Sequence, residues 1–479
     1  MKIKNYKDVF IAMLIGLFIG FLVVYLISFY NMDPLVFFLL FVGLVILLLL
    51  LRRPEYGLIL LIAWPFIQGY ILGRQGKFFS LLTGGLGVGL IVYLLYQFLF
   101  FRLAISHKFK IIIKGKKITF LMILLFVWAF FAAGYGVLKG NELPYVLGDF
   151  YWIVTIPFVY FLTIILIKNQ KQCKKIFYWA ASIILFFFVL DLVKYLQGGF
   201  AIGAIISGQG VPRMLTASGP YSMMIFPLTL TFCLFSKGKE KWLWLLAASL
   251  TLLVLITSLT RTYWYASVGA LIFMFFLFSI REKIRLLYRI LPILLIVLLL
   301  GSFAVIKLKL GINFMNLIIG RGTAFKPASK FLEVKDIVLQ TIQNPLTIFM
   351  GEGMGGRIET WVIGPTIHEI TLTHFIHNNY ARIFLETGIV GLSLYLMIAF
   401  VFLKKTIKFF RKSDKNDYFN RSITLGAIGS FVAVLVGAIG TNTLYGTFTY
   451  LLMGIIVVII YQKSEELNLR ENKATYEKG

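Results

Sequence analysis

The feature that most constrains this chain is a series of long apolar segments that recurs along nearly its whole length. The hydrocarbon core of a bilayer is about 30 Å thick, and a helix needs about 20 apolar residues to cross it. Measured against that length, the sequence contains about 14 candidate spans. They lie at approximately 10–30, 34–51, 56–72, 78–101, 118–138, 150–167, 176–196, 219–235, 242–259, 263–280, 290–308, 379–403, 422–440 and 446–461. The sequence therefore predicts an all-α polytopic membrane protein.

The distribution of basic residues agrees with this interpretation. The chain has 47 Lys and Arg against 20 Asp and Glu, a formal charge of +27. On a folded soluble surface such an excess would suggest a nucleic-acid partner. Here the basic residues lie in short clusters between apolar segments, as in the cytoplasmic loops of membrane proteins. We therefore expect both termini in the cytoplasm, a membrane as the environment and no nucleic-acid partner.

The predicted spans divide the chain into four parts. Residues 1–308 contain the first eleven spans, 309–376 form an external loop region, 377–461 contain the last three spans and 462–479 form a cytoplasmic tail. Helix connections in bundles usually have about 2–8 residues, and much longer ones are functional or disordered. Because the long loop carries several aromatic residues, it is predicted to form a packed external cap.

Three arginines fall on the predicted external side. Arg213 lies in a Gly-rich connection, Arg261 at the turn between two spans, and Arg321 between two glycines of the long loop. Arginine at the outer boundary runs against the positive-inside trend, and its planar fork suits phosphate. The three are therefore candidate ligands for a phosphorylated substrate. Alternatively, each one snorkels to lipid headgroups or pairs with an acid such as Asp149 or Asp191.

The segment that leads from the long loop into the twelfth span is the most informative. Asn378, Arg382 and Glu386 are spaced by four residues, so they share one helix face, and Arg382 and Glu386 can form an ion pair. Ionisable residues at membrane depth are functional candidates by default, although this pair could simply fix the helix against its neighbours. A neutral imidazole at His377 suits general-base work; a capping or hydrogen-bonding role is the alternative.

A second hypothesis for the same region is a metal site made of its histidines and one glutamate. His368, His374 and His377 are three of the four histidines in the chain, and Glu369 lies among them. Their spacing matches neither of the helical zinc motifs. No metal and no other cofactor is therefore predicted.

The order of residues at the twelfth span resembles a known family. His377 and Asn378, followed by Glu386, Gly388 and Gly391 at the entry of a membrane helix, resemble the signature region of the O-antigen ligase and O-antigen polymerase superfamily.

Weaker elements of the same family surround the three external arginines. Arg261 lies in a segment that resembles the family's Ser-Arg element, with Thr260 in place of the usual Ser. Arg321 resembles part of its external-loop element, and Arg213 its upstream Arg element without the usual Pro-Asn dipeptide. The resemblance covers roughly residues 205–400.

The resemblance implies a GT-C-like membrane glycosyltransferase of the bacterial cytoplasmic (inner) membrane. Such enzymes transfer a glycan from undecaprenyl pyrophosphate to a hydroxyl of a lipid, glycan or protein acceptor at the external face, with inversion and without a metal. It implies His377 as the catalytic residue, Arg213, Arg261 and Arg321 as ligands of pyrophosphate or glycan, and Asn378, Arg382 and Glu386 as supporting residues.

Two distinctions stay open at this point. A ligase transfers a finished glycan, whereas a polymerase adds a growing chain to the next lipid-linked repeat unit, and both share this pattern. A lipid-linked oligosaccharide flippase or other transporter is the alternative from another class, because many helices around a basic cavity would suit it. Transporters, however, place ionisable residues near the midplane, whereas here they gather at the external ends of the spans.

Overall fold

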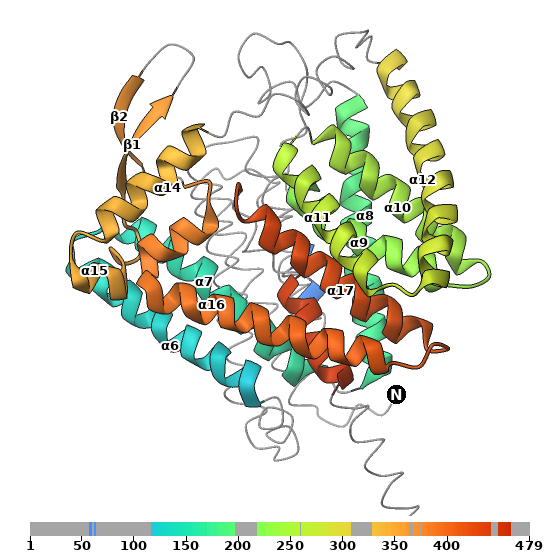
Figure 1. Ribbon diagram of the computed structural model, residues 1–479, viewed down its shortest axis with the longest axis horizontal. Coiled ribbons are helices and arrows are strands. Elements are labelled where there is room, and N and C mark those ends of the chain that lie inside the picture. Colours follow the sequence, from blue (N-terminus) through green and yellow to red (C-terminus); the bar gives the residue numbers. More distant parts are fainter. Residues whose placement is uncertain are drawn as a thin grey trace, which may run out of the picture. The chain divides into compact units, whose positions relative to one another are not determined.

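The computed structural model describes residues 57–59, 62–63, 116–167, 169–196, 218–258, 260–307, 328–363, 368–373, 376–441 and 449–460. Helices dominate this part of the chain (Figure 1). Seven of them are long and apolar enough to cross a membrane: α6 (Lys116–Leu138), α7 (Leu143–Leu166), α8 (Gln170–Leu196), α9 (Ser218–Phe235), α10 (Glu240–Thr257), α16 (Asn379–Lys412) and α17 (Tyr418–Gly437). The prediction of a helical membrane protein is confirmed at this level.

Three further helices coincide with predicted spans. They are α11 (Arg261–Leu277), α12 (Ile280–Lys307) and a shorter apolar helix, Thr449–Ile460. The first four predicted spans, within 10–101, lie almost wholly outside the described residues. The total of about 14 spans therefore stays a prediction.

A turn divides one of the long apolar stretches where the sequence predicted a break. α10 ends at Thr257 and α11 begins at Arg261, after Thr260 in an extended conformation. The hydroxyl of Ser258 donates to the Leu255 carbonyl at 2.7 Å, and such local bonds compete with helix continuation. The turn is closed by the indole of Trp264, which donates to the same carbonyl at 2.8 Å. This geometry confirms the separation into two helices.

α9 and α17 form the most closely packed pair. Nearly all of α9 is buried, and α17 packs along it. A Cβ added at Gly426 would lie 2.4 Å from the Leu228 side chain, so the two backbones approach as small residues permit in membrane helices. The hydroxyl of Thr231 also donates to the Ser422 carbonyl at 2.9 Å across the interface. α10, α11 and α16 each pack against at least one helix of this pair.

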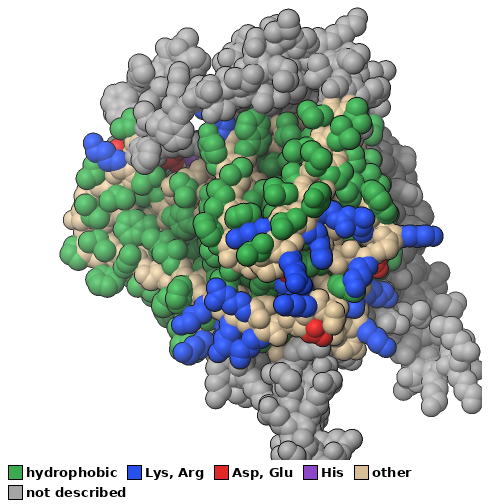
Figure 2. Space-filling model, turned by 45° about the vertical axis from the view of Figure 1, so that its right-hand side comes forward, with side chains coloured by type: hydrophobic (Ala, Val, Ile, Leu, Met, Phe, Trp, Pro, Cys, Tyr) green, Lys and Arg blue, Asp and Glu red, His purple; other side chains and the backbone are tan. Residues whose placement is uncertain are grey.

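Lys and Arg side chains gather on one part of the surface, while apolar side chains cover much of the same face (Figure 2). Exposed basic residues occupy the start of α8, the α9–α10 connection, the start of α12 and the end of α16: Lys171, Lys174, Lys175, Lys237, Lys239, Arg281, Arg285, Lys404, Arg411 and Lys412. Each of these connections was predicted to be cytoplasmic. We refer to the opposite ends of the helices as the outer ends.

The long loop region is folded, but not entirely as helix. It contains α14 (Ala328–Thr341), α15 (Pro345–Met350) and the strands β1 (Ile358–Ile363) and β2 (His368–Thr373). The strands pair antiparallel, with Ile358 opposite Thr373 and Ile363 opposite His368. This hairpin lies within the predicted external loop, for which no particular secondary structure was predicted. Both segments are rich in β-branched residues, which favour a pleated strand.

The expected external cap is packed, and the buried cluster within its described residues is aliphatic. Ile337 of α14, Ile358 of β1 and Leu385 of α16 belong to one buried cluster. Phe349, one of the aromatic residues expected inside, is 59% exposed. The cap therefore rests on the outer part of α16 and does not form a separate core of its own.

A glycine-rich loop, Gly351–Arg357, connects the cap to the outer ends of three helices. Its backbone bonds directly to them: the N–H of Glu352 donates to Leu385 of α16 at 2.6 Å, and that of Met354 donates to Ala132 of α6 at 3.1 Å. Gly353 has a positive φ of 79°, and a Cβ there would lie 2.5 Å from the Gly136 Cα. Only glycine fits such a backbone approach.

Replacing Gly388 by alanine is expected to destabilise this junction. Gly388 interrupts α16 with a φ of 65°, and an added Cβ would lie 2.1 Å from the Phe349 carbonyl oxygen. The expected loss is that of overpacking, about 1–3 kcal/mol, and thermal unfolding of the detergent-purified protein would measure it. Gly134→Ala is the matched control, because no atom lies within 4 Å of its Cβ position. Equal melting temperatures for the two variants would contradict the assigned contact.

Candidate functional site

The imidazole of His377 is held by a carboxylate that sequence analysis did not single out. His377 precedes α16, and its backbone N–H donates to Glu333 Oε1 at 2.5 Å. Its ring Nδ1 lies 3.0 Å from Glu333 Oε2. The Glu333 side chain is 10% exposed and that of His377 is 48% exposed. A carboxylate at Nδ1 favours the tautomer that carries its proton there, so that Nε2 becomes the basic nitrogen.

Asn378 is a structural cap. Its side-chain oxygen accepts from the N–H of Ala381 at 3.0 Å, which satisfies one of the unpaired donors at the start of α16. Its amide nitrogen donates to the Ile439 carbonyl just after α17, at 3.0 Å. Since Asn378 fixes the start of α16 against the end of α17, it positions the neighbouring His377.

The predicted ion pair between Arg382 and Glu386 is confirmed, and it is part of a larger network. Arg382 Nε lies 2.5 Å from Glu386 Oε1, and a terminal nitrogen of the same guanidinium pairs with Asp149 of α7. The other oxygen of Asp149 accepts from the N–H of Gly355 at 2.8 Å. The three charged side chains are between 3% and 13% exposed. This network, which we call the buried triad, ties α7, α16 and the glycine-rich loop together.

The buried triad is almost closed to solvent. Glu386 Oε2 is buried and has no hydrogen-bond partner among the described residues. Asp149 had been considered as a partner for an external arginine, and the structure pairs it with Arg382 instead. Because so little of these side chains is accessible, a supporting role for Arg382 and Glu386 stays the prediction.

Arg261 is the one predicted external arginine that the described residues include. It begins α11, its side chain is partly exposed, and it makes no ion pair with any acid in the described part of the chain. Its turn lies beside the start of α9, because a Cβ at Gly219 would be 3.0 Å from the Tyr263 ring. Arg213 and Arg321 lie outside the described residues.

The end of α17 brings the surroundings of Arg261 and His377 together. Its last turn contacts α11, where a Cβ at Gly269 would lie 3.5 Å from the Val436 side chain. Immediately after α17, the Ala438 carbonyl accepts from the N–H of Asn379 at 2.9 Å. α11, which begins at Arg261, and α16, which begins just after His377, therefore pack against the same outer part of α17.

Within the described ranges, no three His, Cys, Asp or Glu side chains form a group that could hold a metal ion. The side chains of His368 and Glu369 and the whole of His374 lie outside what the structure describes. Independence from metal therefore stays a prediction, to be tested with a chelator.

Comparison with known proteins gives no family assignment: no protein-family model matches the chain, and no curated protein is significantly similar to it. The resemblance described above therefore rests on the quoted motif residues.

Proposed function

We propose that this membrane protein is a metal-independent, inverting glycosyltransferase of the O-antigen ligase or polymerase type. It would transfer a glycan from undecaprenyl pyrophosphate to an acceptor hydroxyl at the external face of the bacterial cytoplasmic membrane. The observation that carries the proposal is the His377–Glu333 pair, a half-exposed imidazole with a carboxylate at Nδ1 at the outer start of a membrane helix. Such a pair is suited to removing a proton from a hydroxyl.

In the proposed reaction, Nε2 of His377 takes the proton of the acceptor hydroxyl. The hydroxyl oxygen then attacks the anomeric carbon from the face opposite to the pyrophosphate. The bond between that carbon and the pyrophosphate oxygen breaks, and its electron pair leaves with undecaprenyl pyrophosphate. Glu333 stabilises the imidazolium that forms, as the third member of a catalytic triad does. Arg261, together with Arg213 and Arg321, would stabilise the charge on the leaving group.

The alternative, a flippase or other transporter, fits the buried charges less well. Asp149 lies near the start of α7 and Glu386 near the start of α16, so the triad is at the outer ends of its helices. Transporters place such groups near the midplane. Charges at one end of the helices favour chemistry at the membrane surface.

The deciding experiment uses purified protein in proteoliposomes with a lipid-linked glycan. A glycosyltransferase releases undecaprenyl pyrophosphate and forms a glycosylated acceptor, and this activity is expected to persist in excess chelator. A flippase instead moves a fluorescent lipid-linked glycan across the bilayer without releasing pyrophosphate. The size distribution of the product separates the subclasses: a ligase gives one addition, whereas a polymerase gives a ladder.

Arg261→Lys is expected to lose most of the transfer activity. A lysine keeps the charge but lacks the planar fork that binds phosphate at two oxygens. The loss of one preorganised donor is worth about 2–4 kcal/mol, or roughly 30- to 1,000-fold in rate. Initial rates of pyrophosphate release would measure it, with Arg285→Lys at the exposed start of α12 as the matched control. Normal turnover of Arg261→Lys would exclude Arg261 from the site.

A further inference from the structure

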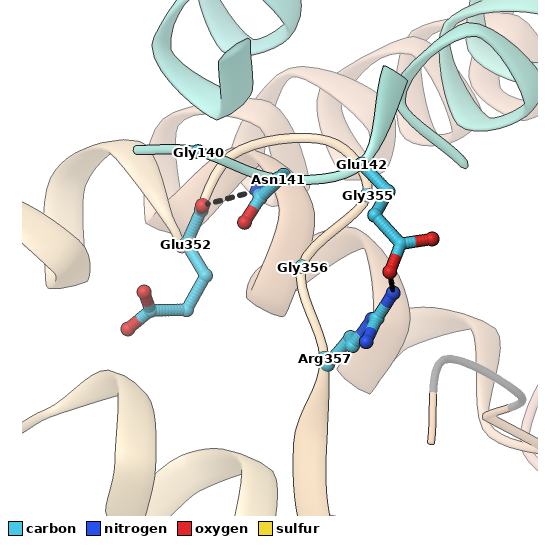
Figure 3. A pocket seen from close by; sticks show the side chains of 7 residues that line it. All are labelled: Gly140, Asn141, Glu142, Glu352, Gly355, Gly356 and Arg357. Atoms are coloured by element: carbon cyan, nitrogen blue, oxygen red, sulfur yellow. Dashed lines mark hydrogen bonds and ion pairs between the residues drawn. The ribbon is translucent and has the colours of Figure 1, made fainter. Parts of the chain in front are cut away.

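A polar pocket of about 250 Å³ opens beside the glycine-rich loop, where this loop meets the α6–α7 connection (Figure 3). The side chains of Glu142 and Arg357 point toward each other, and the Asn141 amide faces the loop backbone. The Glu352 carboxylate extends to the other side of the loop. The lining residues are Gly140, Asn141, Glu142, Glu352, Gly355, Gly356 and Arg357.

The walls of the pocket are fixed by hydrogen bonds. The Asn141 amide donates to the carbonyls of Glu352 at 3.1 Å and Met354 at 2.9 Å. Behind the opposite wall, the N–H of Gly355 donates to Asp149 of the buried triad at 2.8 Å. Because these contacts exist before any ligand arrives, little conformational freedom is lost on binding.

The charges around the pocket balance. Glu142 pairs with Arg357, and Glu352 pairs with Lys139 at 2.5 Å. Burial acts to lower the pKa of Lys139, but its hydrogen bond to Glu352 and the charge of that carboxylate outweigh burial and raise the pKa. Lys139 is therefore positive at neutral pH, and two acids face two bases. The Tyr145 ring lies against Arg357, with 5.3 Å between the guanidinium carbon and the ring centre.

We propose that this pocket binds one sugar residue of the glycan substrate. Sites for drug-sized molecules occupy about 300–1,000 Å³, so the volume of about 250 Å³ suits a single sugar ring. A sugar hydroxyl both donates and accepts, and it can therefore bond to a carboxylate and to a guanidinium. Because the acids and bases around the pocket are equal in number and paired, the pocket offers no excess positive charge to hold a phosphate group. An uncharged polar ligand suits a pocket in which the positive and negative charges balance.

The position of the pocket relates it to His377. Gly355 in the pocket wall bonds to Asp149, and Asp149 pairs with Arg382 in the first turn of α16. His377 lies just before that helix. The pocket and the imidazole are therefore connected through the buried triad and the start of α16. These contacts would fix the position of a bound sugar relative to His377. The identity of the glycan rests on the proposed function, but sugar binding can be tested without turnover.

The test is saturation-transfer-difference NMR on the full-length protein in detergent micelles, with the methyl glycosides of glucose, galactose and N-acetylglucosamine. At least one glycoside is expected to bind. Glu142→Gln and Arg357→Gln are each expected to weaken that binding by about tenfold, the scale of one lost charged hydrogen bond. Glu142 makes no capping hydrogen bond at α7, so its loss leaves that helix start intact. Glu240→Gln, at an exposed acid in the first turn of α10, is the matched control and should bind normally.

A charge-swapped variant distinguishes loss of sugar binding from loss of folding. Glu142→Arg combined with Arg357→Glu retains an ion pair, so it should melt like the wild type and still lose the sugar. His377→Ala should bind the sugar normally.

The outcomes separate the two proposals. Sugar binding without any glycan transfer by the wild type would reject the proposed function but not the assignment of the pocket as a sugar site. The pocket proposal is overturned if no glycoside binds, if the folded pocket variants bind like the wild type, or if inorganic phosphate displaces the sugar.

Discussion

Replacing His377 by alanine is expected to slow glycan transfer by roughly 10²- to 10⁴-fold, the usual contribution of a general base. Donor affinity should stay unchanged, because the imidazole acts on the acceptor hydroxyl and not on the pyrophosphate. The fold should also persist, since the cap of α16 is made by Asn378. Transfer rate and donor affinity would be measured together on detergent-purified protein. His368→Ala, in strand β2, is the matched control and should transfer normally.

Glu333, which pairs with the His377 imidazole, allows a second test of the same mechanism. If Glu333 acts through His377, Glu333→Ala should slow transfer in the wild type and have no further effect in His377→Ala, because residues that act as a unit are not additive. A merely structural role for Glu333 would slow transfer in both backgrounds. Should His377→Ala lose donor binding in proportion to turnover, His377 would belong with the phosphate-binding arginines. If it lost neither, the proposed mechanism would be wrong.

Glu386 is the other titratable side chain near His377 to consider as a base. Its side chain is only 3% exposed, and its Oε1 is bonded to Arg382. An acceptor hydroxyl cannot reach it without opening the buried triad. This burial favours a structural role for Glu386 over that of an alternative base.

Replacing Arg382 by methionine is expected to destabilise the protein by about 3–5 kcal/mol, the cost of removing one partner from a buried ion pair. The change leaves two carboxylates, Asp149 and Glu386, side by side without their cation. We expect a large fall in the melting temperature of the detergent-purified protein. Arg411→Met, at an exposed arginine near the end of the same helix, is the matched control and should melt like the wild type.

A compensated variant separates loss of the charge balance from loss of packing. Combining Arg382→Met with Asp149→Asn and Glu386→Gln removes all three charges, and replacing a whole buried ionic group is often close to neutral. Most of the lost stability should return. A melting temperature of Arg382→Met close to that of the wild type would show that the two carboxylates do not depend on the arginine.

Local features of this protein could be predicted from the sequence. Apolar length alone marks the membrane helices, because a bilayer sets the same requirement for each one. The break between the spans 242–259 and 263–280 was also predicted from length, because the whole stretch is too long for one crossing. The Arg382–Glu386 pair was predicted because the two residues are one helical turn apart. The hairpin was missed, although its β-branched residues carry a local signal, because each strand has only six residues.

The assembly of the site was decided by the tertiary structure. Glu333 is 44 residues from His377, and Asp149 is 233 residues from Arg382. The pocket likewise joins the α6–α7 connection to a loop that follows it more than 200 residues later. Spacing along one helix indicates which of its own residues share a face, but it carries no information about which other element will lie against that face. That choice is made when the helices and the cap pack together, through close glycine contacts and buried ion pairs.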